Sequence, residues 1–206
     1  MPNGAIFELI SWQSKAVSQT MYLTVTACWI FFGVILVVGK RGAAPGARQS
    51  DRRSLVGMLL QGLACAICFA VFRDRFRPIF PMSEASEAIL GALTVALALW
   101  STWFCYQAAR TLGKQWALVA RVIEGHELVR RGPYAIVRNP IYLAMFGMLI
   151  ATGLAISRWQ ALVPAIAVYL IGTTVRIRSE ESLLRATFGA QFDDYARRVP
   201  AFLPRL

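Results

Sequence analysis

Residues 141–175 read IYLAMFGMLIATGLAISRWQALVPAIAVYLIGTTV, and this stretch determines what kind of fold the chain can adopt. It contains two apolar runs, Ile141–Ile156 and Ala161–Val175, which are separated by only four residues including Arg158. Apolar runs of this kind are typical of helices inside a bilayer, and so short a connection returns the chain at once to the side it came from. We therefore expect a tight helical hairpin in a membrane.

The first arm of this hairpin is short. As a helix it covers about 24 Å, less than the ~30 Å of hydrocarbon in a bilayer, so we expect it to thin the bilayer locally or to lean on the protein around it. Small residues recur at a spacing of four on both arms, which lets the two helix backbones approach closely. They are Gly147, Ala151 and Ala155 on the first arm and Ala161 and Ala165 on the second.

Three further apolar runs precede the hairpin: Thr20–Gly39, Leu55–Phe72 and Ala88–Ala109. Each is close to the ~20 residues that a helix needs to cross a bilayer. A chain that is 57% hydrophobic and 16% charged also carries more apolar surface than a soluble domain of this length can bury. The predicted fold class is all-α, an integral membrane protein with five transmembrane helices, the last two a tight hairpin, plus a C-terminal amphipathic cytoplasmic helix.

The distribution of basic residues predicts an orientation. Of the 22 Lys and Arg residues, 17 lie in the segments 40–53, 110–138 and 176–205, which alternate with the other connections. Because basic loops stay in the cytoplasm, we expect the N-terminus outside and the long polar segments, with the C-terminus, inside. The net charge of +11 is not arranged as a basic stripe with interleaved aromatics on a polar domain, so nucleic acid is not an expected partner.

The sequence indicates neither a metal site nor an ion-coupled transporter. The four cysteines all lie in apolar runs, where a thiol acts as a packing residue. Cys65 and Cys68 form a CxxC, but tetrahedral zinc needs four ligands and the single histidine, His126, lies in another segment. The five predicted spans contain no acidic residue of the kind that couples ions at the bilayer midplane.

Two polar stretches, His126–Tyr142 and Arg176–Pro204, bracket the hairpin. Because the hairpin leaves and returns to the same face, we expect the two stretches to lie side by side. Gly132 and Pro133 predict a turn, and Pro140 suits the first position of a helix. The donors and acceptors of the first stretch suit a ribose, an adenine edge or an amino acid carboxylate, although an interfacial belt of Tyr and Arg is the alternative from physical chemistry alone.

The second stretch is predicted to be helical. Its apolar residues recur at spacings of three, four or seven, as on one face of a helix. They are Ile177, Leu184, Phe188, Phe192, Tyr195 and Val199. Arg176 and Glu180 are four residues apart where the last span leaves the hydrocarbon, so they can contact each other and a ligand at the interface. The alternative is an ordinary helix-stabilising ion pair, which contributes a few tenths of a kcal/mol when exposed.

Together, the two stretches resemble the isoprenylcysteine carboxyl methyltransferases and the related phospholipid methyltransferases. The resemblance covers about residues 110–206. It rests on His126, Leu128, Val129, Gly132, Pro133, Tyr134, Arg138, Asn139, Pro140, Tyr142, Arg176, Ile177, Glu180, Glu181, Phe188, Gly189, Tyr195 and Pro204. There are two departures. Asn139 stands where the family usually has His, so a charged side chain there is excluded, and Phe192 stands where a tyrosine is common.

The resemblance implies a single transmembrane methyltransferase domain, residues 1–206, whose cofactor-binding core is about 110–206. S-adenosyl-L-methionine would bind in a cytoplasmic pocket without a metal, and a lipophilic or lipidated acceptor, for example a prenylcysteine-type carboxylate, would enter from the bilayer. Arg176 would anchor or polarise the acceptor, and Glu180 would orient Arg176 or act as a base. The implied cofactor-binding residues are His126, Leu128, Val129, Gly132, Tyr134, Arg138, Asn139, Pro140, Tyr142 and Glu181.

Two other functions stay open from the sequence. One is an NADPH-dependent membrane reductase of the steroid reductase type, which shares a similar helical core and a related Arg-His-Pro element. The other is a non-catalytic membrane accessory protein in which the pattern is vestigial. Within the methyltransferase hypothesis, the acceptor is open as well, because a carboxylate, an amine and a thiol all present lone pairs that one pocket can align.

Overall fold

The computed structural model describes residues 3–41, 52–73, 79–113 and 128–204 of the 206-residue chain. These residues form helices throughout, and their only β-type pairing is a single bridge between Phe72 and Ser157. The predicted all-α class is therefore confirmed for the part of the chain that the structure describes. The elements are α1 (Asn3–Arg41), α2 (Arg52–Ala70), α3 (Glu84–Leu112), the 3₁₀ turn η2 (Gly132–Ala135), α4 (Pro140–Ile156), α5 (Trp159–Phe188) and α6 (Ala190–Arg198).

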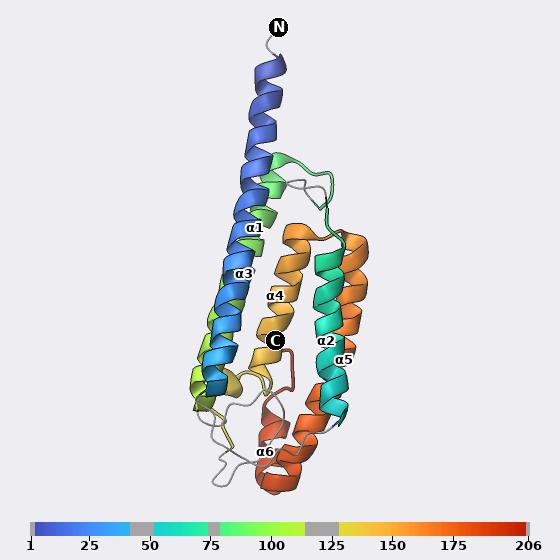
Figure 1. The fold of residues 1–206 in the computed structure, drawn as a ribbon. Coiled ribbons are helices and arrows are strands. Elements are labelled where there is room, and N and C mark those ends of the chain that lie inside the picture. The colour runs from blue at the N-terminus through green and yellow to red at the C-terminus, as the bar shows by residue number, and fades with distance from the viewer. Residues whose placement is uncertain (1–2, 42–51, 74–78, 114–127, 205–206) are drawn as a thin grey trace.

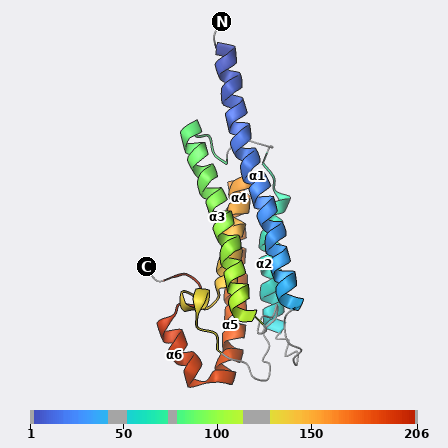
Figure 2. The same cartoon turned by 90° about the vertical axis from the view of Figure 1, so that its left-hand side faces the viewer.

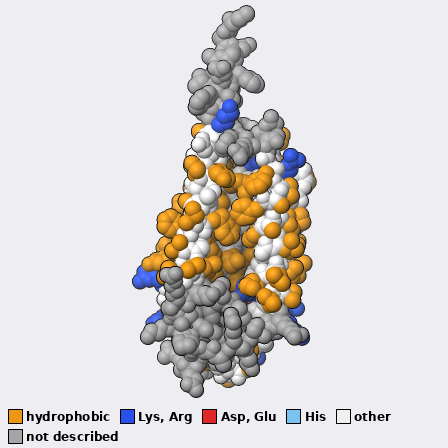
Figure 3. Space-filling model, in the orientation of Figure 1, with side chains coloured by type: hydrophobic (Ala, Val, Ile, Leu, Met, Phe, Trp, Pro, Cys, Tyr) orange, Lys and Arg blue, Asp and Glu red, His pale blue; other side chains and the backbone are white. Residues whose placement is uncertain are grey.

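Each predicted span corresponds to a helix of its own, although the predicted span Leu55–Phe72 extends two residues beyond the end of α2 at Ala70. The helices α1, α2, α3 and α5 are long and apolar enough to cross a membrane, whereas the 17 residues of α4 are apolar but fall short of that length. In Figure 3 hydrophobic side chains cover the middle of the visible face, and Lys and Arg side chains lie toward its two ends. The chain is thus a multi-pass membrane protein.

Helix α4 lies at the centre of the bundle, between the pair α1–α3 and the pair α2–α5 (Figure 1). Met148 packs in a core with α1 and α3, and its neighbour Leu149 packs in a second core with α2 and α5. Both side chains are fully buried. A helix that is apolar all round and covered by protein on two sides explains why so short a segment is tolerated here.

Successive helices run in opposite directions, so the connections collect at the two ends of the bundle (Figures 1 and 2). At one end, the backbone after α2 pairs with the turn between α4 and α5. The amide of Arg73 donates to Ile156 O at 3.0 Å, and the amide of Arg158 donates to Val71 O at 3.3 Å. At the other end lie η2, the beginning of α4, the last turns of α5 and all of α6, which together carry the polar stretches.

The stretch after the last predicted span is helical and ends in the short amphipathic helix α6, but it is not one continuous helix as predicted. Helix α5 continues without interruption past Val175 to Phe188, and α6 is a separate helix of 9 residues. Gly189 separates them with φ 51° and ψ −125°, a conformation that only glycine adopts readily. The apolar residues predicted to share one helical face therefore lie on two helices.

Gly147, one of the small residues predicted to bring the two arms of the hairpin together, packs against a different helix. A Cβ at Gly147 would overlap the hydroxyl of Ser101, so this glycine of α4 makes room for α3 and not for α5. Among the described glycines, those whose added Cβ would meet the backbone of another helix join α2 to α5: a Cβ at Gly172 would lie 2.8 Å from the carbonyl oxygen of Gly57. Two glycines far apart in the chain thus meet, which no periodicity within one helix could indicate.

Candidate active site

The turn η2 places the first polar stretch. Gly132 has φ 60°, and a Cβ there would lie 3.0 Å from the hydroxyl of Thr111, so both the conformation and the space favour glycine. The predicted Gly-Pro turn is confirmed. It is fastened by Tyr195, whose hydroxyl donates to the carbonyl oxygen of Tyr134 at 2.6 Å. Burial raises the pKa of Tyr134 and raises that of Tyr195 to about 12, so both hydroxyls remain protonated donors at neutral pH.

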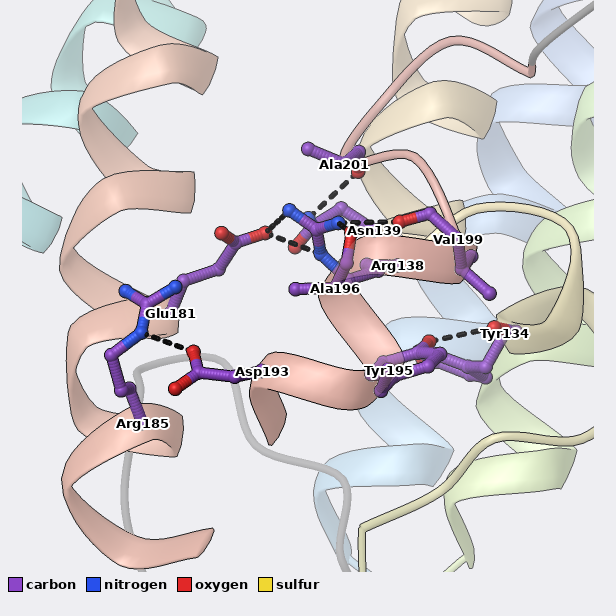
Figure 4. A network of polar contacts seen from close by, with 10 residues as sticks. All are labelled: Tyr134, Arg138, Asn139, Glu181, Arg185, Asp193, Tyr195, Ala196, Val199 and Ala201. Carbon is purple, nitrogen blue, oxygen red and sulfur yellow. Dashed lines mark hydrogen bonds and ion pairs between the residues drawn. The ribbon is translucent and has the colours of Figure 1, made fainter. Parts of the chain in front are cut away.

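Arg138 is the centre of the polar network in Figure 4. Its Nε donates to Glu181 Oε1 at 2.8 Å, and its Nη2 lies 2.7 Å from the same oxygen. Its Nη1 donates to two backbone carbonyls near the end of α6, those of Ala196 at 3.0 Å and of Val199. One guanidinium, on the connection between η2 and α4, therefore contacts both α5 and the C-terminal segment. The set Tyr134, Arg138, Asn139, Glu181 and Tyr195 is called the Arg138 cluster below.

Asn139, the departure from the resembled family, has a structural partner. Its Nδ2 donates to the carbonyl oxygen of Ala201 at 2.8 Å, beside the backbone bond from Arg138 N to Pro200 O at 2.9 Å. The amide thus fastens the C-terminal segment to the start of α4. Phe192, the other departure, is fully buried, and the guanidinium of Arg138 lies 6.0 Å from its ring centre.

Arg176 is the centre of a second polar group. Its Nη2 donates to Glu180 Oε1 at 3.2 Å, which confirms the predicted contact between these two residues. Its guanidinium lies 4.7 Å from the ring centre of Tyr142, and the hydroxyl of Tyr142 donates to the same oxygen of Glu180. The Tyr142 carbonyl in turn accepts a hydrogen bond from Tyr169 at 2.7 Å.

A third helix takes part in this group. Arg176 Nη1 donates to Gln61 Oε1 at 3.2 Å, and Gln61 Nε2 donates to the hydroxyl of Thr173 at 2.9 Å. Arg176 is only 6% exposed although it carries a charge, so its hydrogen bonds offset the cost of burial. The set Gln61, Tyr142, Thr173, Arg176 and Glu180 is called the Arg176 cluster below.

A hollow lies against the Arg138 cluster. It has about 440 Å³ of empty space, a volume that includes open solvent. Its walls combine leucines, a valine and aromatic rings with one ion pair and one amide. The lining residues are Leu112, Leu128, Val129, Tyr134, Arg138, Asn139, Glu181, Leu184, Phe192 and Tyr195.

The predicted cofactor residues separate into three groups. Leu128, Val129, Tyr134, Arg138, Asn139 and Glu181 line the hollow. Gly132 and Pro140 shape the backbone beside it, at the turn η2 and at the first position of α4. Tyr142 lies in the Arg176 cluster with the predicted catalytic residues Arg176 and Glu180. His126 lies outside the described residues.

Several residues of the site were missed at the sequence level. Leu112, Leu184, Phe192 and Tyr195 line the hollow but were not assigned to binding. Gln61 and Thr173 are buried polar residues of membrane helices. The available signal was that Gln61 interrupts an otherwise apolar run, since such residues are costly in a membrane and therefore carry a role. Among the described residues, no three His, Cys, Asp or Glu side chains are grouped so that they could hold a metal ion.

These features define a helical membrane protein with two polar clusters at one end of its bundle. The part of the chain that carries these clusters also matches a known protein family. Residues 87–191 match the phospholipid methyltransferase family, a region that contains α4, α5 and both clusters except Gln61 and Tyr195. The chain belongs to this family of membrane methyltransferases, which confirms the resemblance drawn from the sequence.

Three known proteins are similar to this chain. A nickel-cobalt-cadmium resistance protein of Alcaligenes xylosoxydans xylosoxydans is 43% identical over 98 residues, 47% of this chain and 45% of that protein. A cobalt-zinc-cadmium resistance protein of Cupriavidus metallidurans is 36% identical over 119 residues, 57% and 49% respectively. A protein-S-isoprenylcysteine O-methyltransferase of Saccharomyces cerevisiae is 30% identical over 146 residues, 69% and 59%. The matched part thus spans about half the length of the bacterial relatives.

Proposed function

We propose that the chain is an integral membrane methyltransferase that uses S-adenosyl-L-methionine and methylates a lipophilic or lipidated acceptor. One observation carries the proposal: consecutive carboxylates of α5 belong to two different polar groups. Glu181 pairs with Arg138 at the wall of a partly open hollow, and Glu180 pairs with the buried Arg176. A cofactor site and an acceptor site in such proximity suit a group transfer, because holding two reactants in line can supply about 7–11 kcal/mol of the barrier.

The residues of the hollow fit the proposed cofactor. Its apolar walls, among them Leu128, Val129 and Leu184, suit the adenine ring, and the Arg138–Glu181 pair offers charges of both signs to the zwitterionic amino acid end. Bound S-adenosyl-L-methionine supplies a methyl group on a sulfonium for direct displacement. The protein holds that group, excludes water from it and aligns the acceptor.

The Arg176 cluster is the proposed acceptor site. A buried guanidinium that stacks on Tyr142 suits an anionic group, so among carboxylate, amine and thiol we propose a carboxylate carried by a lipid-modified molecule. The name of the yeast relative, which describes an O-methyltransferase for isoprenylcysteine, supports this class. Glu180 orients Arg176, and it accepts the acceptor's proton when the nucleophile is protonated.

The proposed orientation follows the charge distribution. All five long apolar segments, α4 included, cross the bilayer, with the N-terminus outside and both clusters on the cytoplasmic side. The shortness of α4 and its burial between other helices support a locally thinned bilayer around the site. Cysteines introduced at Ser14 and at Arg198 would test this, because only the second should be labelled from the cytoplasmic side of sealed vesicles.

A transfer assay tests the function. Purified protein in bicelles is incubated with S-adenosyl-L-methionine labelled with tritium on the methyl group and with three acceptors: a prenylcysteine carboxylate, an aminophospholipid and a small thiol. We expect label in the carboxylate product, released again by mild base as a methyl ester requires. Transfer to the amine or thiol alone would overturn the proposed acceptor class. If label enters none of the three acceptors and no component of a membrane extract, the proposed methyltransferase activity is overturned.

The alternative functions have different observables. A reductase would bind NADPH, and a non-catalytic accessory protein would bind neither nucleotide. Neither the family match nor the three relatives favours the reductase. The metal resistance in the names of the two bacterial relatives belongs to those proteins, and we propose no metal chemistry for the described residues of this chain.

A further inference from the structure

Helix α2 lies outside the region that matches the family, yet among the described helices it makes the most extensive contact with α5. A Cβ at Gly57 would lie 2.6 Å from the carbonyl oxygen of Gly172 and would also overlap the side-chain stem of Arg176. The arginine side chain therefore runs across the bare backbone of α2. Any side chain larger than hydrogen at Gly57 would displace it.

Gln61 follows Gly57 by one helical turn on the same face of α2. It is 2% exposed, and both ends of its amide are used: the oxygen accepts from Arg176 Nη1 at 3.2 Å, and the nitrogen donates to Thr173 Oγ1 at 2.9 Å. A buried amide among apolar helices costs free energy unless such bonds are made. Because Thr173 holds one end of the amide, its oxygen points at the guanidinium.

Two groups of opposite character thus hold Arg176. Glu180 binds Nη2 with a charge, at the aqueous end of α5, and Gln61 binds Nη1 without one, deeper in the bundle. Glu180 already balances the charge of Arg176, so a second carboxylate in place of Gln61 would make the group net negative and repel an anionic acceptor. An amide fixes the plane of the guanidinium without adding charge. The contact with the Tyr142 ring fixes the same plane from the side.

We propose that Gln61 is a positioning residue, which orients the guanidinium of Arg176 toward the acceptor from a helix that carries none of the family motif. This proposal rests on the proposed role of Arg176 in acceptor binding. Gln61 itself touches neither cofactor nor acceptor. Its loss should therefore reduce the rate of transfer without changing the affinity for S-adenosyl-L-methionine.

The test uses Gln61→Met, which keeps the volume and removes both hydrogen bonds. We expect kcat/KM for the acceptor to fall roughly 10- to 100-fold, as for a small misplacement of a reacting group, while the Kd for S-adenosyl-L-methionine stays within about twofold. The matched control is Thr152→Val in α4, outside the Arg176 cluster. It likewise removes two hydrogen bonds of a buried side chain, the one from Trp29 Nε1 at 2.9 Å and the one to Met148 O at 2.7 Å. Thr152→Val should lose as much thermal stability as Gln61→Met but keep the transfer activity of the wild type.

A second readout does not depend on activity. In protein labelled with [15N]arginine, the signals of Arg176, assigned by their loss in Arg176→Lys, should show slow rotation of the guanidinium that becomes fast in Gln61→Met. If Gln61→Met does not fold, Thr173→Val serves instead, with an expected loss of about 2- to 5-fold because only the outer end of the amide is released. Unchanged rotation and kinetics in the variant, or an equal loss in Thr152→Val, would overturn the proposal. If the Arg176 guanidinium rotates slowly in the wild type but the wild type transfers no methyl group, the proposed function is overturned, while the role of Gln61 in holding Arg176 is not.

Discussion

Glu180 and Glu181 are consecutive residues of α5, yet their carboxylates belong to two different polar clusters. Glu180 contacts Arg176 and Tyr142 among the membrane helices, whereas Glu181 contacts Arg138 beside the hollow. Because successive residues of a helix are rotated by about 100°, one turn of α5 can serve two sites at once. The pair of acidic residues is therefore the link between them.

The two clusters are held in different ways. The Arg176 cluster consists of side chains on α2, α4 and α5, and each of its contacts is lost when a side chain is changed. The Arg138 cluster depends in part on the backbone carbonyls of Ala196, Val199 and Ala201. These carbonyls belong to the end of α6 and the C-terminal segment, so changing a side chain there does not remove them. We expect substitutions in the Arg176 cluster to lower turnover and substitutions in the Arg138 cluster to weaken cofactor binding.

Substitution of Arg176 should have the largest effect. Arg176→Ala removes the cation proposed to bind the acceptor, so we expect turnover to fall about 10²- to 10³-fold, as when a preorganised charge stabiliser is removed. The Kd for S-adenosyl-L-methionine should change less than about threefold. Because the partner Glu180 is left without this cation, thermal unfolding is measured alongside to show that the variant is folded. Near-normal turnover would mean that Arg176 is structural.

Substitution of Glu181 should give the opposite pattern. Glu181→Gln loosens the charged contact with Arg138 at the wall of the hollow, and we expect the Kd for S-adenosyl-L-methionine to rise roughly tenfold, which corresponds to about 1.4 kcal/mol. Turnover at saturating cofactor should change little. Glu180→Gln is the matched control, since it makes the same chemical change one residue away in the other cluster. If both variants lose the same property, the two clusters are one site.

The break between α5 and α6 should affect the cofactor side only. Gly189→Ala forces a side chain into a backbone conformation with φ 51°, at a cost of about 1–3 kcal/mol, and shifts α6 with the Phe192 and Tyr195 side chains that line the hollow. Weaker cofactor binding and a lower Tm should follow. Gly62→Ala is the control, because this glycine lies in the middle of α2 with no atom within 4 Å of an added Cβ. An equal effect of both substitutions would contradict the role of the break.

Substitution of Asn139 should have the smallest effect. Asn139→Ala removes the hydrogen bond to the carbonyl oxygen of Ala201, and the expected loss of stability is about 0.5–1.5 kcal/mol, measured by thermal unfolding in detergent. Asn139→His restores the residue usual in the resembled family and keeps an N–H donor, so it should lose less. A gain of activity in Asn139→His would show that this position acts on the reaction and not only on the C-terminal segment.

The membrane helices could be predicted because long apolar runs and charged connections reflect the physics of the bilayer directly. Each predicted span corresponds to one helix, with α2 ending two residues before the predicted boundary, and the i, i+4 spacing of Arg176 and Glu180 correctly predicted their contact. Pairings between distant segments could not be predicted in this way. The contact of Gly57 with Gly172 and the bond of Gln61 to Arg176 depend on which helix lies beside which.

The end of α5 was mispredicted for a local reason. The apolar spacing on both sides of Gly189 agrees with one continuous helix, and a single glycine with positive φ interrupts it. The sequence predicted a catalytic role for Glu180 and a cofactor-binding role for Glu181, and the two residues lie in different clusters. Both roles stay predictions.

Calorimetric titration of the detergent-solubilised protein with S-adenosyl-L-methionine and S-adenosylhomocysteine tests the central claim most directly. We predict saturable binding of both to the wild type, binding about tenfold weaker in Glu181→Gln, and unchanged binding in Glu180→Gln. The absence of binding at millimolar ligand, or an equal loss in the two variants, would contradict the assignment of the hollow beside Arg138 to the cofactor and of the Arg176 cluster to the acceptor.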